Sequence, residues 1–350
     1  MEPYDPEDYD PDAEIPDIGL DPNERCVSVT NTGEVERVCY VTVFDVPCLG
    51  RDGKRLGMGQ TADDDGNERG ATTFIALCPP LTFVHLCTLD LPEAMTMAEV
   101  QIESDISDAN PHPDPEDEHP LGLAFPLACR GGPSAPSTED GNNNGDSDTT
   151  WQDDVSEPSY LCTQGEGGHL THFLRGNYHA IDFRCKEGTP ILAAGDGTVV
   201  EVQDSRRLTG VAVGNLYGWN SVMIELDAPP PSQSVAKDRP MEGNGFDASS
   251  ASESAEGGPL FVEYVHIQYK SSVVKRGERV TRGQIICRSG SVGFSPEPHL
   301  HFSAFRSKDP LAPTVRVRFL RPPDESGEAD KGGFIPRAGM KYNGLGALDE

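Results

Sequence analysis

The chain has 350 residues, which is long enough for two domains with separate hydrophobic cores. Its 58 acidic residues outnumber its 28 Lys and Arg, and the net charge of −30 argues against a nucleic-acid partner, since phosphate binding requires basic surfaces. Hydrophobic residues make up only 36%, with 37 Gly and 30 Pro, so we expect linkers and loops over a good share of the chain.

Residues 1–24 are acidic and rich in proline, and they predict a disordered tail. This segment lacks the basic and then apolar order of a signal peptide. No window holds 18 consecutive apolar residues, so we expect no transmembrane segment.

The second segment, residues 25–104, has the pattern of short strands. Runs rich in β-branched residues, such as 37–44 and 71–78, alternate with turn residues such as Pro79-Pro80. This pattern predicts a small β-sandwich-like domain, in which we find no catalytic constellation.

Six of the nine cysteines precede residue 150. Their density predicts disulfides and an oxidising compartment, either secreted or an organelle lumen, although the compartment is unknown because the chain carries no export address. The pairing is open, and the odd total leaves at least one thiol without a partner in the chain. The cysteines are Cys26, Cys39, Cys48, Cys78, Cys87, Cys129, Cys162, Cys185 and Cys287.

The remaining segments predict one further domain between flexible stretches. Residues 105–158 have the composition of a disordered acidic linker. Residues 159–318 have a pattern of short strands separated by turns that contain Gly and Pro. Residues 228–259 form a low-complexity insertion, which we interpret as a surface loop rather than a lid over a groove. Residues 319–350 predict a flexible tail. The fold class is therefore mainly β, with a second domain built on an antiparallel sheet.

The run Pro298-His299-Leu300-His301-Phe302 places two imidazoles two residues apart. Side chains at i and i+2 of a strand point to the same face, so His299 and His301 can serve one site. Neutral imidazole is a common zinc ligand and also carries protons near neutral pH.

Three other segments of this domain carry histidine or aspartate. They are Gly167-Gly168-His169-Leu170-Thr171-His172, Tyr178-His179-Ala180-Ile181-Asp182-Phe183 and Glu263-Tyr264-Val265-His266-Ile267. Several histidines and one aspartate suit a hydrolytic zinc site, which needs three protein ligands, an open position for water and nearby proton carriers. We interpret Tyr264 as a packed residue rather than a groove residue.

This series of motifs, in this order, resembles the lysostaphin-like zinc endopeptidases, which cleave bacterial peptidoglycan and share a β-sheet core called the duplicated hybrid motif. The resemblance covers about residues 160–306, less than half of the chain. It includes the segments Ala180-Ile181-Asp182-Phe183, Ala194-Gly195-Asp196-Gly197-Thr198-Val199, Gly218-Trp219-Asn220-Ser221 and Val274-Lys275-Arg276-Gly277-Glu278.

The resemblance implies that zinc is held by a first histidine, Asp182 and His301, and that His266 and His299 handle protons and the oxyanion. Many relatives have the first histidine four residues before the aspartate, where this chain has Tyr178. His179 would lie on the opposite strand face from Asp182. Against a second version of the family motif, His172 takes the ligand position, and we favour His172 over His179.

The resemblance therefore implies a zinc metalloendopeptidase acting on glycine-containing cross-links of peptidoglycan, with Zn²⁺ as cofactor. The alternative is a non-catalytic module on the same fold that binds cell walls or activates another enzyme. We expect the chain to be a monomer.

Overall fold

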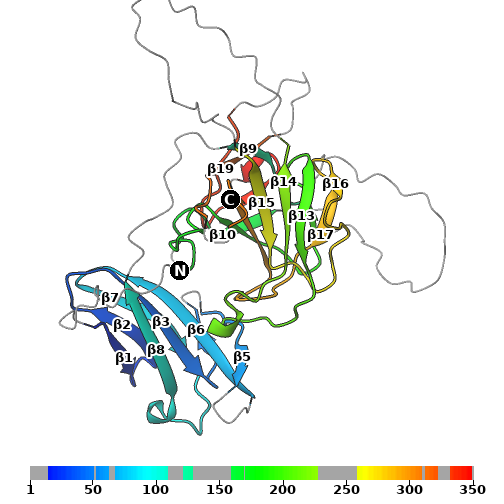
Figure 1. Ribbon diagram of the computed structural model, residues 1–350. Helices are drawn as coiled ribbons and strands as arrows, with labels where there is room; N and C mark the ends of the chain where they lie inside the picture. Colours follow the sequence, from blue (N-terminus) through cyan, green and yellow to red (C-terminus); the bar gives the residue numbers. More distant parts are fainter. Residues whose placement is uncertain are drawn as a thin grey trace, which may run out of the picture.

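A computed structural model describes residues 15–50, 53–62, 68–108, 121–128, 159–168, 170–227, 258–309, 312–321 and 332–348. The described chain is almost entirely β-structure, and nearly all of its strand pairs are antiparallel (Figure 1). The predicted fold class, mainly β with an antiparallel C-terminal sheet, is confirmed. No helix in the described ranges is long and apolar enough to cross a membrane.

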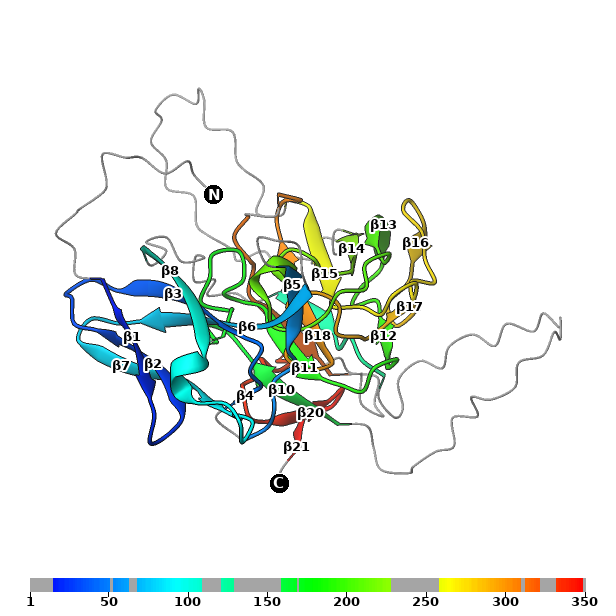
Figure 2. The same ribbon diagram turned by 90° about the horizontal axis from the view of Figure 1, so that it is seen from below.

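The N-terminal part forms two four-stranded sheets that share one hydrophobic core (Figure 2). The first contains, in spatial order, β1 (Asp17–Asp21), β2 (Cys26–Asn31), β7 (Thr82–Leu89) and β4 (Cys48–Leu49). The second contains β5 (Gly59–Ala62), β6 (Glu68–Cys78), β3 (Arg37–Phe44) and β8 (Gln101–Asp108). We call this unit, residues 17–108, the N-terminal sandwich.

Alternation along β3 and β6 explains why this sheet has two different faces. Cys39, Val41 and Val43 point into the core of the sandwich, where they pack with Phe74 and Ala76. The residues between them therefore form an outer face, which carries Val38, Tyr40, Ile75 and Leu77.

Several strands lie wholly or partly in stretches that the sequence predicted to be tails or linker. Strand β1 falls within residues 1–24, and β8 extends beyond residue 104. Strand β9 (Leu121–Ala124) lies in the predicted linker, where it pairs in parallel with β19 (Val317–Leu320). The end of the chain adds the hairpin β20 (Lys341–Asn343) and β21 (Gly346–Leu348), which pairs with strand β10 and so belongs to the C-terminal sheet. We propose the two-domain division with these extended boundaries.

Linker residues 109–120 and 129–158, the first 14 residues and residues 228–257 lie outside the described residues. Cys129 lies outside them as well. The eight described cysteines are buried free thiols, so disulfide pairing stays a prediction.

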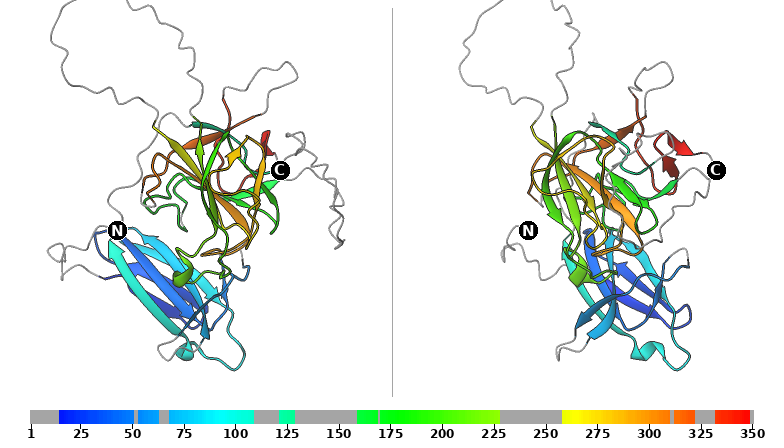
Figure 3. Two further views of the ribbon diagram at one scale, coloured as in Figure 1. Left: turned by 45° about the vertical axis from the view of Figure 1, so that its right-hand side comes forward. Right: turned by 90° about the vertical axis from the view of Figure 1, so that its right-hand side faces the viewer.

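The C-terminal part is built on a nine-stranded antiparallel sheet (Figures 1 and 3). In spatial order its strands are β16 (Arg279–Val280), β13 (Gly197–Gln203), β14 (Ser221–Leu226), β15 (Leu260–Val265), β18 (His299–Phe305), β11 (Ile181–Arg184), β10 (Tyr160–Gln164), β20 and β21. A two-stranded sheet of β12 (Pro190–Leu192) and β17 (Ile285–Arg288) adds to this domain.

The two faces of this sheet differ in chemistry because their side chains alternate. Leu300 and Phe302 of β18 point to the hydrophobic core, together with Tyr264 of β15 and Phe183 of β11. The opposite face carries the polar residues between them, including both histidines of β18. The core thus holds the sheet from one side and leaves the other side free for a site.

Tyr264 is fully buried, in agreement with its interpretation as a packed residue. Its ring contacts Phe302 edge to face at 5.3 Å between centroids, and its hydroxyl oxygen accepts the amide of Ala194 at 2.7 Å. This hydroxyl links the connection between β12 and β13 to the central strands.

Tyr264→Phe tests this link, because it keeps the ring contact and removes the acceptor. A buried amide without a partner costs about 1–3 kcal/mol, so we expect the free energy of unfolding to fall by that amount in urea titrations of the full chain. The control is Tyr217→Phe, whose side chain is 66% exposed and should change stability by less than about 0.5 kcal/mol. Equal stabilities for the two variants would contradict the structural role of the Tyr264 hydroxyl.

Candidate metal centre

The register of β11 and β18 brings the two segments with the strongest chemical motifs side by side. Asp182 lies directly opposite His301, and Arg184 lies opposite His299. All four side chains therefore share one face of the sheet. The expectation that His299 and His301 lie on the same strand face is correct.

Three donor atoms converge at this point. The Nδ1 atom of His301 lies 2.8 Å from Oδ1 of Asp182. The Nε2 atom of His172 lies 3.3 Å from the same carboxylate oxygen and 3.3 Å from Nδ1 of His301. Within the described part of the chain, His172, Asp182 and His301 each offer one ligand atom, and these three atoms lie close enough together to bind one metal ion.

The spacing of these atoms fits a tetrahedral zinc ion. Zinc bonds of about 2.0–2.1 Å at tetrahedral angles place neighbouring donor atoms about 3.3 Å apart. Two imidazole nitrogens and one carboxylate oxygen are also donors that zinc takes in hydrolytic sites, where a fourth position holds water or substrate. The residues present therefore fit the metal that the sequence implies.

His172 is oriented by the loop that precedes it. Its Nδ1 donates to the carbonyl oxygen of Gly165 at 3.0 Å, which leaves the lone pair on Nε2 facing Asp182. The imidazole is fully buried. A hydrogen bond of this kind fixes both the tautomer and the ring direction of a metal ligand.

Gln164 is a functional candidate that sequence reasoning missed. Its Nε2 donates to Oδ2 of Asp182 at 2.8 Å, and its Oε1 accepts the amides of Leu170 and Thr171 at 3.0 and 3.2 Å. One side chain thus orients the carboxylate and shapes the loop that carries His172. No local pattern marks this glutamine, because its partners come from separate segments.

His179 lies outside the group of donors. Its Nδ1 is 3.5 Å from Oε1 of Glu166, and its backbone amide donates to Oγ1 of Thr314 at 3.0 Å. The prediction that His179 lies on the opposite strand face from Asp182 required a strand that includes residue 179. Strand β11 begins at Ile181, however, and His179 lies in the preceding turn. The geometry still favours His172, since that side chain contacts Asp182.

His266 follows the last residue of β15 and has a backbone φ of 62°. This left-handed conformation is uncommon for residues other than glycine and turns the chain sharply at the end of the strand. The Nδ1 atom of His266 donates to the carbonyl oxygen of Val292 at 2.8 Å, so its Nε2 carries the free lone pair.

His299 is held in the same way. Its Nδ1 lies 2.8 Å from the carbonyl oxygen of Glu297 and 3.1 Å from Oγ of Ser295. Its Nε2 lies 3.8 Å from Oδ1 of Asp182. The ring centroid of His299 is 4.6 Å from that of His266, which in turn is 6.0 Å from that of His301. The two further imidazoles therefore flank the three donors.

The electrostatics of the group favour an ionised Asp182 beside neutral His266 and His301. Burial by itself raises the pKa of Asp182, but His172, His299 and His301 together outweigh it and hold the pKa well below its usual range. Burial lowers the pKa of His266, and repulsion from His299 and His301 lowers it further. Burial likewise lowers the pKa of His301, against the attraction of Asp182. Neutral imidazoles and a carboxylate are the protonation states that bind a metal.

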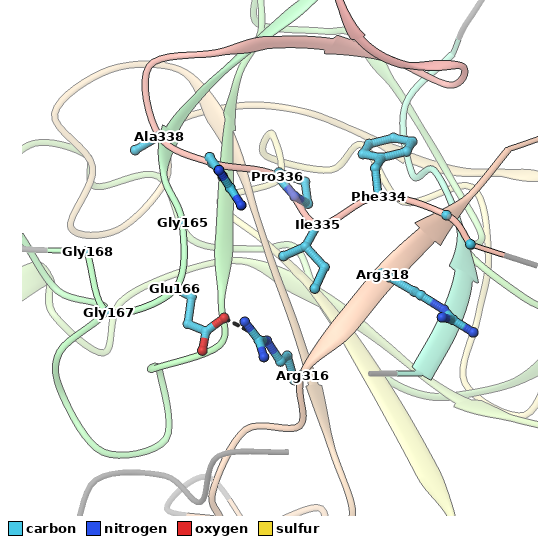
Figure 4. Close-up of a pocket in the computed structure, with 13 residues that line it drawn as sticks. Gly165, Glu166, Gly167, Gly168, Arg316, Arg318, Phe334, Ile335, Pro336 and Ala338 are labelled. Carbon is cyan, nitrogen blue, oxygen red and sulfur yellow. Dashed lines mark ion pairs between the residues drawn. The ribbon is translucent and has the colours of Figure 1, made fainter. Parts of the chain in front are cut away.

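A separate cavity of about 650 Å³ is lined in part by the loop that carries Gly165 and Glu166 (Figure 4). Arg316 pairs with Glu166 at 2.8 Å on one wall, and Phe334, Ile335 and neighbouring residues form another. None of the five residues around the candidate metal centre lines this cavity. The metal centre itself is nearly closed, since each of its five residues is exposed by less than 10%.

Comparison with known proteins gives a family for this domain. Residues 252–313 match the family model described as Peptidase family M23. The chain is 30% identical over 144 residues to the glycyl-glycine endopeptidase ALE-1 of Staphylococcus capitis, an alignment that covers 41% of this chain and 29% of that protein. It is 27% identical over 201 residues to lysostaphin of Staphylococcus simulans, with 54% and 31% of the two chains covered.

Among solved structures, the catalytic domain of the antimicrobial peptidase lysostaphin from Staphylococcus simulans is 21% identical and has a TM-score of 0.27. That comparison covers 45% of this chain and 87% of the other. The aligned region thus spans about 30% of the length of each curated relative. Within that region, the chain carries a peptidase M23 domain that is homologous to those of lysostaphin and ALE-1.

Proposed function

We propose that this chain is a zinc metalloendopeptidase that hydrolyses peptide bonds of bacterial peptidoglycan, with glycine-containing cross-links as its substrates. The observation that carries the proposal is the convergence of His172, Asp182 and His301, with donor atoms 2.8–3.3 Å apart. The similarity to ALE-1, which is a glycyl-glycine endopeptidase, supports the choice of substrate. Relatives of this kind also support a place of action outside the cytoplasm.

In this proposal His172, Asp182 and His301 hold the zinc ion. When bound, zinc supplies Lewis-acid polarisation of the scissile carbonyl and lowers the pKa of the attacking water. Asp182 offsets part of the charge of the ion, and Gln164 keeps its carboxylate turned toward the two imidazoles.

His266 and His299 are the proposed proton carriers. Because backbone carbonyls accept their Nδ1 hydrogens, Nε2 is the atom of each ring that can accept a proton. An imidazole that takes the proton of the attacking water at Nε2 can then donate it to the oxyanion or to the leaving amine. Both rings lie beside the donors, so we assign these steps to the pair.

Zinc content tests the ligand assignment. We expect about one zinc ion per full-length chain by elemental analysis, and a chelator should abolish cleavage of a glycine-rich peptide. We expect zinc affinity to fall by more than about 100-fold in each of His172→Ala, Asp182→Ala and His301→Ala. Mutation of a residue that only hydrogen-bonds to a metal ligand already lowers metal affinity by about 10–100-fold.

His179→Gln is the matched control for these variants, because His179 is equally buried but contacts Glu166. It should retain zinc. Zinc lost from His179→Gln and kept in His172→Ala would instead assign the first ligand to His179. Full zinc occupancy without turnover in the unaltered chain would favour the alternative of a non-catalytic module.

Substitution of the proton carriers should separate chemistry from metal binding. We expect His266→Ala and His299→Ala to keep one zinc ion per chain while kcat falls by about 10²–10⁴-fold, which is the usual contribution of general acid–base catalysis. The measurement is peptide cleavage together with elemental analysis on the same samples. Unchanged kcat in both variants would refute their role.

A further inference from the structure

The segment Val292–Glu297 orients both proposed proton carriers. The Val292 carbonyl accepts Nδ1–H of His266, and the Glu297 carbonyl accepts that of His299, each at 2.8 Å. Arg184 anchors the end of the segment through an ion pair with Glu297 at 2.7 Å. The direction of both imidazoles therefore depends on where this segment lies.

The middle of this segment packs on the N-terminal sandwich. Phe294 is buried, and it belongs to a hydrophobic cluster that is separate from the core of the C-terminal domain. The cluster contains Val38 and Ile75 from the outer face of β3 and β6, and Val211 from the loop between β13 and β14. Phe173, which directly follows His172, packs against the same cluster.

The loop between β13 and β14 links the two parts through its backbone. On one side, Val211 donates to the carbonyl oxygen of Gly57 at 2.8 Å, and Val213 donates to Oγ1 of Thr73 at 2.9 Å. On its other side, the Leu208 carbonyl accepts the amide of Gly293 at 2.8 Å. The loop is thus held between the sandwich and the segment that orients His266 (Figures 1 and 3).

The contact is closely packed and depends on glycine. A Cβ added at Gly59 of β5 would lie 2.6 Å from Cβ of Ala212 and 3.0 Å from its amide nitrogen. A Cβ at Gly57 would lie 3.3 Å from the carbonyl oxygen of Pro296, inside the orienting segment. Side chains do not fit between these surfaces, so the interface has one tight arrangement.

We infer that the N-terminal sandwich positions the imidazoles of His266 and His299 by holding the loop at 208–213 and Phe294. This inference rests on the proposed function, and it makes Gly59, Ile75 and Phe294 positioning residues. Misplacement of a catalytic group by about 1 Å can cost about 10²-fold in rate. A shift of the interface should therefore lower kcat more than it lowers the affinity for zinc or for substrate.

The test is Gly59→Ala in the full chain, which forces β5 away from Ala212. We expect kcat for a glycine-rich peptide to fall at least about tenfold, with KM and zinc content unchanged. Gly214→Ala is the matched control, because a Cβ there meets no atom within 4 Å. It should keep wild-type kcat. Gly59→Ala combined with Ala212→Gly removes the closest contact and should recover part of the lost kcat.

A second readout does not depend on activity. Nitrogen-15 spectra of the histidine rings report which ring nitrogen carries the proton. We expect Nδ1–H signals for His266 and His299 in the unaltered chain, and a changed ratio of tautomers in Gly59→Ala but not in Gly214→Ala.

The outcomes separate this inference from the proposed function. If the unaltered chain shows no zinc-dependent cleavage, the proposed function fails, while the ring spectra still test the positioning. If Gly59→Ala has the same kcat and spectra as the unaltered chain, or a higher kcat, the inference is overturned. Loss of folding in Gly59→Ala would be visible by circular dichroism, and Ile75→Ala, which opens the same interface without a clash, should then show the fall in kcat.

Discussion

The structure of the C-terminal domain depends on one buried carboxylate among three imidazoles. Removing a carboxylate from water is costly unless charges and hydrogen-bond donors compensate it. Asp182 has that compensation from His172, His299 and His301, and from the amide of Gln164. Because β11 and β18 place Asp182 directly opposite His301, the compensation is built into the register of the central sheet.

Backbone carbonyls define the chemical state of the imidazoles around this carboxylate. Gly165, Val292 and Glu297 each accept an Nδ1 hydrogen, from His172, His266 and His299 respectively. Each of these three rings therefore carries a hydrogen on Nδ1, and Nε2 is its other nitrogen. His301 differs, since its Nδ1 lies against Asp182. For His172, His266 and His299, loop carbonyls rather than the sheet thus determine which ring nitrogen carries the hydrogen.

These loops are supported from two directions. The sheet and its hydrophobic core hold the strands that carry Asp182 and His301. The N-terminal sandwich contacts the loop at 208–213 and the segment around Phe294 from outside. The sandwich thus contacts segments next to the candidate centre, although every side chain of the centre comes from the C-terminal part.

The sequence by itself determined the fold class and the polar strand face that His299 and His301 share, and its family resemblance predicted His172, Asp182 and His301 as metal ligands. Alternation along a strand is local, so two histidines at i and i+2 must share a face. Contacts between residues from separate segments were decided only by the tertiary structure. Gln164 meets Asp182 only after β10 and β11 pair, and β9 joins the C-terminal domain only by pairing with a strand almost 200 residues later. The sandwich packs closely against the C-terminal part at Gly59. The hydrophobic periodicity of the sequence does not predict this contact, because it exists only once both surfaces are folded.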